Sequence, residues 1–378
     1  MLISILDIKY PPKESFVEGL LIRTLSNEMN VKQIIITARD DSYKKVHRKR
    51  QCIYLNILPQ RKSIGRISGM VHLYFILRLI KKKYKQRTIS LLVRNDPFYL
   101  LISVISINFG RDGTFLSSFP HEYSPVFVLK RFLARTIFLY VGKYIKRTIT
   151  VSKIGEVRLA RSGIRGKCLS VPMCVNRSDI VSLDYRDGIK SENNILKFIY
   201  IGTHINTRDL GLIFQVFIEA INNGLNLVLH TYGASEDEKK WIDENIIKNT
   251  YSGKICVHGT LNRKELFKVM GQYDVGISLI PPLYIYMEST PTKLAEYFSQ
   301  GLPVIANSEI PFQKKVISES HAGKIVKYDK TEIYSGIKWL YDNMDQLPTM
   351  KTNAIKYVHE KLIYENYADS ALKHMNRL

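Results

Sequence analysis

Short runs of β-branched and other apolar residues alternate along the chain with longer segments whose apolar residues recur at helical spacing. This alternation is typical of parallel sheets whose strands are joined by crossover helices. Because it occurs twice, we predict an α/β protein with two doubly wound, Rossmann-like domains facing a cleft. Strands are expected at residues 2–8, 33–37, 52–57, 89–93, 148–152, 196–202, 225–230, 254–259, 275–280 and 303–307. Helices are expected at 17–29, 64–83, 210–222, 236–247, 263–270 and 293–300.

A length of 378 residues exceeds what one hydrophobic core usually supports, which also favours two domains. The segment 176–194 is polar, charged and poor in apolar residues, as expected of a linker. We therefore predict an N-terminal domain at 1–185 and a C-terminal domain at 191–350. Residues 351–378 have a helical pattern, and we expect these helices to pack back across the hinge.

The cysteines, the N-terminus and the lengths of the apolar runs argue against a zinc- or disulfide-stabilised protein, an exported protein and a membrane-spanning protein. The four cysteines, at positions 52, 168, 174 and 256, form no CxxC pair and have no histidine at ligand spacing, which argues against a zinc site or a disulfide framework. The N-terminus has a strand pattern and lacks the features of a signal peptide. The longest nearly uncharged run, 97–110, is shorter than the roughly 20 residues of a membrane-spanning helix. We expect a cytoplasmic protein without a transmembrane span.

The net charge of +22 is concentrated in the first half of the chain. Residues 1–190 hold 35 Lys and Arg against 13 Asp and Glu, whereas residues 191–378 hold 21 of each kind. A surface of one sign attracts partners of the other sign, so nucleic acid and anionic lipid are both candidates. A solvated basic face that serves only solubility is the alternative.

Two segments of the basic half join cations to long apolar and aromatic runs. Residues 68–87 (SGMVHLYFILRLIKKKYKQR) and 127–147 (FVLKRFLARTIFLYVGKYIKR) each predict a helix. Such helices can lie in a membrane interface with their cations at anionic headgroups. Alternatively, their apolar residues belong to the domain core and their cations to its solvated rim. Their shared place in the basic half favours the membrane.

The segment 288–306 (ESTPTKLAEYFSQGLPVIA) has the strongest chemical signal. Thr290 suits a helix N-cap and Pro291 the first helical position, so a helix start should offer free N–H groups and a positive dipole end. Such an end binds phosphate. Glu288 precedes this start and Glu296 lies about two turns into the helix, so they can contact different parts of one ligand. On spacing alone, two such glutamates indicate only an exposed helix face.

In this context the segment resembles the signature of glycosyltransferase family 4, a large retaining family of GT-B fold. The family pattern is close to E-x-x-P-x-K-x-x-E-x-x-x-x-G-x-P-V-I, and the chain fits each of those positions. The resemblance implies that Glu288 contacts the donor sugar in the catalytic centre. It also implies that Thr292 and Lys293 contact the diphosphate and that Glu296 binds the ribose hydroxyls.

The likeness extends to the start of the C-terminal domain. FIYIG followed by TRDLG resembles the first strand and the phosphate-side loop of the family's donor domain. By this resemblance Gly202, Thr203 and Arg208 bind the donor. The family often has Arg directly after the glycine, where this chain has Thr203, so the diphosphate charge is assigned to Arg208. A surface ion pair of Arg208 with Asp209 or a neighbouring residue is the alternative.

The N-terminal domain resembles the family less closely. His121 follows an expected strand at the position where the family often places a catalytic His facing the donor sugar, although a lone His is also common in surface loops. Ser15 and Phe16 stand where many members have paired glycines, and Gly19 is a candidate substitute for them. In SVPMCVN, Asn176 and its neighbours depart from the family's I-P-N-G-V-D turn.

We therefore predict a retaining glycosyltransferase that moves a hexose or N-acetylhexosamine from a nucleoside-diphosphate sugar to an acceptor hydroxyl. The acceptor expected is a lipid-linked saccharide, such as a polyprenyl-diphosphate saccharide or a lipopolysaccharide core, in bacterial surface polysaccharide synthesis at the inner face of the cell membrane. The basic N-terminal half would contact the anionic membrane. The chain has no Asp-x-Asp pair, so no metal or other cofactor is expected.

The sequence is also compatible with other classes of function. A sugar-nucleotide epimerase or a glycan phosphorylase could share the fold. A nucleic-acid-binding protein would also explain the charge, but the cations here are interleaved with long aliphatic runs and no nucleic-acid-binding module is recognised.

Overall fold

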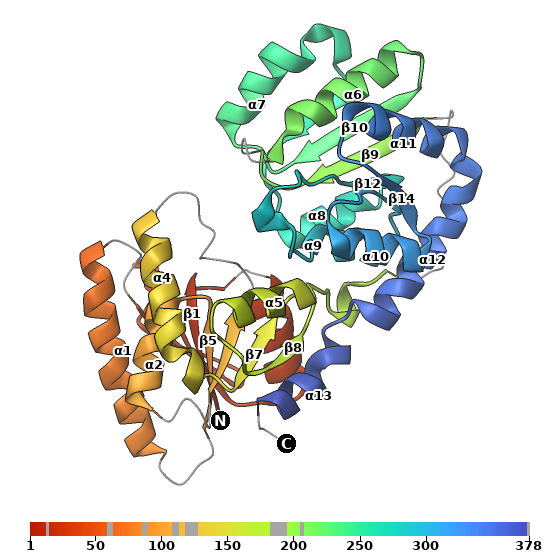
Figure 1. The fold of residues 1–378 in the computed structure, drawn as a ribbon. Helices are drawn as coiled ribbons and strands as arrows, with labels where there is room; N and C mark the ends of the chain where they lie inside the picture. Colours follow the sequence, from red (N-terminus) through yellow and green to blue (C-terminus); the bar gives the residue numbers. More distant parts are fainter. Residues whose placement is uncertain are drawn as a thin grey trace. The chain divides into compact units, whose positions relative to one another are not determined.

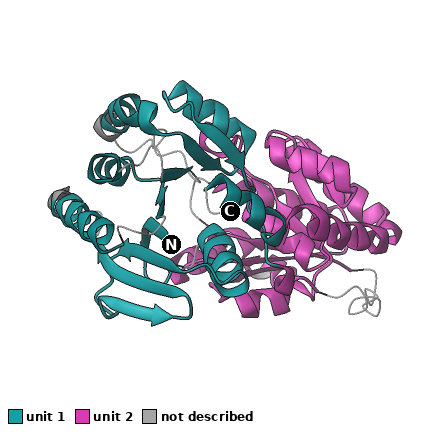
Figure 2. Ribbon diagram, turned by 90° about the horizontal axis from the view of Figure 1, so that it is seen from below, with its two compact units in different colours: residues 1–176, 364–378 teal, residues 177–363 magenta. Residues whose placement is uncertain are grey.

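The computed structural model describes residues 1–12, 15–58, 63–84, 89–107, 113–117, 128–181, 195–204 and 208–375. The chain divides into two compact units, which Figure 2 shows in two colours. Unit 1 comprises residues 1–176 and 364–378, and unit 2 comprises residues 177–363. The division thus falls at the start of the polar segment 176–194, the segment in which the sequence analysis predicted the domain boundary.

The described part of unit 1 forms an eight-stranded sheet in the order β3-β4-β2-β1-β5-β6-β7-β8. Neighbouring strands are parallel except for the β3–β4 pair, which is antiparallel. Strands β2, β5 and β6 are buried along their whole length, as expected when both faces of a parallel sheet are covered. The strands are β1 (Leu2–Lys9), β2 (Gln33–Ala38), β3 (Val46–Lys49), β4 (Cys52–Leu58), β5 (Ser90–Arg94), β6 (Gly113–Ser117), β7 (Arg147–Thr150) and β8 (Lys167–Ser170).

Helices α1, α2 and α4 cover one face of this sheet and lie next to one another (Figure 1). The C-terminal helix α13 packs against η1, a helix of π type that follows β1. The described helical elements of unit 1 are η1 (Val17–Glu28), α1 (Ser63–Lys83), α2 (Pro97–Ser106), α4 (Val128–Val141), η3 (Gly142–Tyr144), α5 (Lys153–Arg161) and α13 (Glu365–His374).

The described part of unit 2 forms a six-stranded, fully parallel sheet in the order β11-β10-β9-β12-β13-β14. Its core joins the aromatic rings of Phe198, Phe214 and Phe217 to aliphatic residues of the strands. The strands are β9 (Leu196–Ile201), β10 (Leu227–Tyr232), β11 (Ile255–His258), β12 (Val275–Ser278), β13 (Val304–Asn307) and β14 (Gly323–Val326). The main helices are α6 (Leu210–Asn222), α7 (Glu236–Ile242), α8 (Arg263–Met270), α9 (Thr292–Ser299), α10 (Pro311–Ser320), α11 (Lys330–Asp342) and α12 (Leu347–Lys361).

Two doubly wound α/β units confirm the predicted fold class, and two helix predictions, at 210–222 and 263–270, agree with the structure at both ends. The antiparallel strand β3 was not predicted, because its short run VHRK is mostly exposed and lacks the apolar pattern of the other strands. The helix predicted at 236–247 is α7 followed by a π-helical turn, η8 (Asp243–Ile247). No described helix is long and apolar enough to cross a membrane.

The charge asymmetry follows the structural division. Unit 1 holds 34 Lys and Arg against 12 Asp and Glu, a net +22, whereas unit 2 holds 22 of each kind. The terminal segment divides between the units, because α12 belongs to unit 2 and α13 to unit 1. The excess positive charge is therefore a property of one compact body.

Candidate functional site

The strand order of unit 2 defines one place in its sheet where a ligand crevice is expected. The first strand, β9, lies between β10 and β12, so the connections leave β9 and β12 in opposite directions. In open α/β sheets such a switch point, at the carboxyl ends of the strands, is where ligands bind. Gly202 follows β9 directly, and the loop after β12 leads to helix α9. Both predicted donor-binding segments therefore meet at this point.

Glycines allow the backbone to turn tightly at the carboxyl ends of β9 and β10. Gly202 has φ +152° and Gly233 has φ +117°, a conformation that side chains rarely adopt. A Cβ atom on Gly233 would lie only 2.4 Å from the carbonyl oxygen of Gly202. The turn therefore needs glycine at position 233, which keeps the loop that carries Gly202 and Thr203 against the end of β10. Thr203 is exposed there.

Two cations converge beside this turn, each over an aromatic ring. The Nζ atom of Lys293 lies 4.4 Å from the ring centre of Tyr200, and the guanidinium of Arg208 lies 4.7 Å from the ring centre of Tyr286. Burial and then the charge of Arg208 lower the pKa of Lys293 to about 7. Two neighbouring cations that raise each other's energy form a site that an anion would stabilise.

Arg208 lies over the ring of Tyr286, and the ion pair with Asp209 that was the alternative is not formed. The hydroxyl of Tyr328 donates to Asp209 instead.

Helix α9 begins one residue later than the predicted cap at Thr290 implies. Pro291 is the N-cap and Thr292 the first helical residue, whereas the sequence favoured Thr290 as cap and Pro291 in the first turn. Pro291 has extended backbone angles, which the chain adopts as it leaves the loop after β12. No side chain caps the helix start. Thr292 and Lys293, the two residues assigned to the diphosphate, therefore form the first turn, where helical N–H groups lack partners within the helix.

Tyr297 fixes α9 on the sheet. Its hydroxyl accepts a hydrogen bond from the Ile201 amide at 2.9 Å and lies 3.3 Å from the Ile199 carbonyl, both on β9. A Cβ on Gly276 of β12 would lie 2.6 Å from the Tyr297 ring, so this glycine makes room for the ring. The helix start that carries Lys293 is thereby positioned directly at the end of β9.

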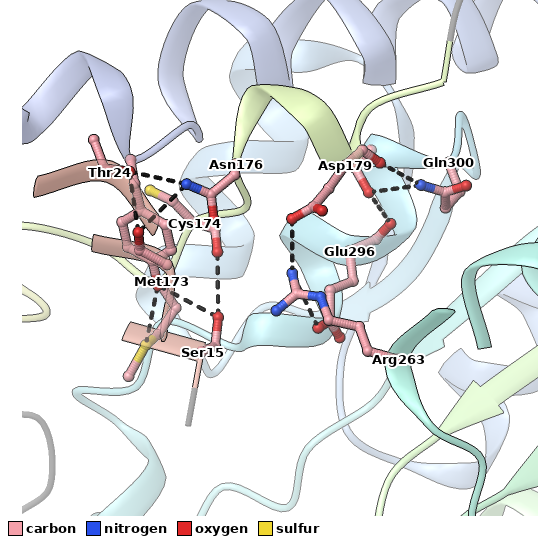
Figure 3. A network of polar contacts seen from close by, with 12 residues as sticks. Ser15, Thr24, Met173, Cys174, Asn176, Asp179, Arg263, Glu296 and Gln300 are labelled. Carbon is pink, nitrogen blue, oxygen red and sulfur yellow. Dashed lines mark hydrogen bonds and ion pairs between the residues drawn. The ribbon is translucent and has the colours of Figure 1, made fainter. Parts of the chain in front are cut away.

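Neither glutamate of the signature points freely into solvent. Glu288 is 7% exposed. The Glu296 side chain is 14% exposed and lies 3.9 Å from the guanidinium of Arg263, which also pairs with Asp179 at 3.3 Å (Figure 3). Burial raises the pKa of Glu296, the charge of Arg263 opposes this shift, and Asp179 adds to it. Both signature glutamates are thus largely buried, and Glu296, the fifth residue of α9, lies about one turn into the helix and not two as predicted.

Arg263 is a component of this site that the sequence reasoning missed. It is the first residue of α8, whose start is capped by Asn262 in a capping box with Glu265. The Arg263 guanidinium stacks on Phe267 at 5.0 Å and holds the Glu296 carboxylate in place. Its position in the NRKEL segment carries no functional signal, because the segment has the pattern of an ordinary capped surface helix.

Residues of unit 1 for which a donor role was considered have structural roles. Phe16 is fully buried and packs edge-on against Tyr364, with ring centres 5.9 Å apart. A Cβ on Gly19 would lie 2.2 Å from the Tyr364 ring, so Gly19 makes room for that ring and does not replace the missing glycine pair. Ser15 donates to the Cys174 carbonyl, and the Asn176 amide donates to Thr24 at 2.9 Å (Figure 3).

The remaining predicted site residue, His121, lies outside the described residues, as does Glu122 beside it. Its catalytic role stays a prediction. Among the residues that the structure describes, no group of three or more His, Cys, Asp or Glu is placed to hold a metal ion.

Comparisons with known proteins bear on this arrangement. Residues 184–357 match the family of glycosyl transferases group 1. No curated protein matches the chain. Among solved structures, sucrose-phosphate synthase from Thermosynechococcus elongatus is similar with a TM-score of 0.74 and 14% identity, covering 100% of this chain and 98% of that one.

Two further solved structures share the fold along nearly the whole chain. A glycosyltransferase from Rickettsia africae has a TM-score of 0.72 at 14% identity, covering 99% of this chain and 97% of that one. A trehalose-phosphate synthase (UDP-forming) from Burkholderia vietnamiensis has a TM-score of 0.71 at 10% identity, covering 99% and 96%. The family match and the shared architecture identify the chain as a glycosyltransferase of GT-B fold whose residues 184–357 form a glycosyl transferases group 1 domain.

Proposed function

We propose that unit 2 binds a nucleoside-diphosphate sugar at the switch point of its sheet and that the enzyme transfers the sugar with retention of configuration. The observation that carries this proposal is the convergence of Lys293 and Arg208 on the uncapped start of α9. A diphosphate matches two cations and a helix N-terminus in charge and in hydrogen-bonding groups. Gly202 and Thr203 would contact the same diphosphate from the turn after β9.

The two glutamates would hold the ends of the donor. Glu288 would accept hydrogen bonds from sugar hydroxyls, and Glu296 would accept them from the ribose. Arg263 keeps the Glu296 carboxylate oriented, and this charge favours the ionised, acceptor-only form of Glu296 despite its burial. Carboxylates on both sides of the phosphate site would therefore fix the donor along its length.

In the proposed reaction the bond between the anomeric carbon and the diphosphate oxygen breaks, and its electron pair leaves with the diphosphate. The acceptor hydroxyl attacks from the same face, and its proton passes to a phosphate oxygen. Lys293, Arg208 and the N–H groups at the start of α9 would stabilise the charge that grows on the leaving group, which is the main source of rate enhancement. This scheme requires neither a covalent nucleophile nor a divalent ion.

A thermal-shift screen with UDP-, GDP-, ADP- and dTDP-sugars tests the donor proposal, because a ligand that binds only the folded state raises Tm. We expect one class of sugar nucleotide to stabilise the wild type and not the Lys293→Met variant. Lys324→Met is the matched control, since Lys324 also stacks on an aromatic ring, Trp339, at 4.1 Å. The donor site is refuted if no nucleotide binds or if Lys293→Met responds like the wild type.

For the acceptor we propose a lipid-linked saccharide, as in bacterial surface polysaccharide synthesis, bound by unit 1 at the inner face of a membrane. Helices α1, α2 and α4 leave large apolar side chains in solvent, including Phe75 at 60% exposed and Phe132 at 66%. Exposed apolar patches of this kind are typical of interaction surfaces. The exposed set is Val71, Phe75 and Leu79 on α1, Ile105 on α2, and Phe132, Leu133, Leu139 and Tyr140 on α4.

These exposed side chains argue against the alternative that α1 and α4 supply only core residues. Leu73 and Leu77 of α1 are buried in the core, whereas Val71, Phe75 and Leu79 lie on the opposite face of the same helix. Cations follow the apolar face at the end of α1. An apolar face with adjacent Lys and Arg in a unit of net charge +22 suits an anionic membrane surface.

A phosphorylated sugar is the second candidate acceptor, because similar folds include sucrose-phosphate and trehalose-phosphate synthases. Transfer assays with the donor found above, offered a polyprenyl-diphosphate saccharide or a hexose phosphate, separate the two. We expect transfer to the lipid-linked acceptor, with a rate that EDTA does not change. Hydrolysis, epimerisation or phosphorolysis without transfer would favour the alternative enzymes, and salt-sensitive binding to DNA without binding to anionic vesicles would favour a nucleic-acid-binding role.

A further inference from the structure

A pocket of about 1030 Å³ lies at the amino edge of the unit 1 sheet, on the opposite edge from the carboxyl ends of its strands. Arg147, the first residue of β7, and Lys167, the first residue of β8, line it. Helix α13, which lies beside β8 in Figure 1, closes one side with Lys373 and His374. The pocket is thus distinct from the switch point at which ligands are expected in this kind of sheet.

Cations dominate the lining of this pocket, and none of the described residues that line it is acidic. Five of the six cations are exposed and one, Arg147, is half-buried. Like charges gathered around one concave space repel each other, and the field that they produce is strongest inside that space. An anion in the pocket would relieve this repulsion. The six cations are Lys143, Lys146, Arg147, Arg165, Lys167 and Lys373.

The backbone segments that line the pocket are in close contact with one another. A Cβ on Gly142 would lie 2.3 Å from the Gly163 carbonyl oxygen, and a Cβ on Gly166 would lie 2.5 Å from the carbonyl carbon of Lys146. The turn after α4 and the turn before β8 therefore touch backbone to backbone. The backbone at Lys146 thus lies against the backbone between Arg165 and Lys167, so these three cations belong to one site and not to separate loops.

The positive charge of the pocket affects His374, which lies at its wall. One ring nitrogen, Nε2, lies 2.9 Å from the Thr148 carbonyl oxygen, which anchors α13 to β7. Burial lowers the pKa of His374, and the charges of Arg147 and Lys167 lower it further, whereas the bond to Thr148 opposes the shift. The cations of the pocket are therefore close enough to disfavour one more positive charge at its wall.

We propose that this pocket binds a phosphate-bearing anion of at least two negative charges. Lys and Arg side chains around one space supply the charge-assisted hydrogen bonds that phosphate oxygens accept. Leu139 lines the pocket and is exposed, and Lys143 lies 5.8 Å and 5.0 Å from the ring centres of Tyr140 and Tyr144, which are exposed as well. Because exposed apolar and aromatic side chains lie beside the cations of the pocket, the headgroup of an anionic lipid is the source that the structure favours over a free phosphate compound.

Hydrogen exchange of the intact protein with and without inorganic pyrophosphate tests the site locally, so binding at the donor site does not obscure the result. We expect saturable protection of the segments 142–147, 163–167 and 370–375. The triple variant Lys146→Ala/Arg165→Ala/Lys167→Ala should lose this protection. The matched control is Lys44→Ala/Lys45→Ala/Lys49→Ala, which removes three exposed lysines at and before β3, at the other end of the same sheet, and should keep it.

Sedimentation with phosphatidylcholine vesicles, with and without phosphatidic acid, separates the two sources of phosphate. For a lipid headgroup we expect binding only to the anionic vesicles, weakened about 100-fold in the triple variant and a few-fold at most in the control. Pyrophosphate protection without vesicle binding would assign the pocket to a soluble phosphate compound. Protection that is absent, or equal in the wild type and the triple variant, would overturn the site. Neither assay uses a sugar donor, so this result is independent of the proposed transfer reaction.

Discussion

The carboxyl edge of the unit 2 sheet and the amino edge of the unit 1 sheet both gather cations, but by different means. In unit 2, Lys293 and Arg208 are partly buried and held over the rings of Tyr200 and Tyr286. In unit 1, exposed cations such as Lys146 and Arg165 surround an open pocket. Burial lowers the pKa of Lys293, and both unit 2 cations are held over rings, whereas the unit 1 pocket depends on the number of its cations. Catalysis requires cations in fixed positions, as in unit 2. Binding of a charged group needs only a high density of positive charge, as in the unit 1 pocket.

Removing the buried cation should have the largest effect. In Lys293→Met we expect the transfer rate to fall at least about 100-fold, because one preorganised group that stabilises the leaving group is typically worth about 2.7–4 kcal/mol. Single-turnover assays of the wild type and the variant measure it. Lys324→Met should stay within about twofold of the wild type. Equal losses in both variants would show that the effect comes from the fold and not from the site.

The backbone at the unit 2 edge should be nearly as sensitive. Gly233→Ala should lower the free energy of unfolding by roughly 3 kcal/mol, because its Cβ would clash with the Gly202 carbonyl and its φ is +117°. Gly224→Ala, also at positive φ but with nothing within 4 Å of the added Cβ, should cost only about 1 kcal/mol. Urea denaturation compares the two. If both variants lose the same stability, the close approach of the two turns is not what the site depends on.

Proton linkage should distinguish the buried lysine from the exposed ones. Lys293 has a folded pKa of about 7, below the unfolded value of about 10.4, so it is protonated in both states below pH 7. Between pH 7 and pH 10 the unfolded chain binds more protons, and stability should rise with pH by up to about 1.4 kcal/mol per unit. The difference between the wild type and Lys293→Met, from urea denaturation at several pH values, isolates this contribution. A difference that does not change with pH would show that Lys293 titrates like a surface lysine.

The ion pair that orients Glu296 should have the smallest effect. A double-mutant cycle of Arg263→Ala and Glu296→Ala should give a coupling of about 0.5–1 kcal/mol in stability, since both side chains are partly exposed and 3.9 Å apart. Donor affinity should show a larger coupling than stability if Arg263 positions Glu296 for the ribose. Additive effects on affinity would remove Arg263 from the donor site.

Local patterns in the sequence were sufficient for most of the fold of unit 2 and for the segment that carries its site. The helices at 210–222 and 263–270 and the signature 288–306 could be predicted because periodicity, capping residues and motif spacing all act over a few residues. The same reasoning missed β3, whose exposed residues form a strand only because β4 lies beside it. It also placed the cap of α9 one residue early, at Thr290.

The sequence by itself determined the two α/β units, the unequal charge and the identity of the signature residues, because each depends on residue type and near neighbours. Only the tertiary structure decided that Gly19 makes room for Tyr364, that Arg263 meets Glu296, and that the burial of Lys293 lowers its pKa. It also brought residues 139–169 and 370–374 around one basic pocket. The physical reason is the same in each case. Packing, burial and electrostatic field depend on which segments, far apart in the sequence, become neighbours in the fold, and a local sequence pattern does not contain that information.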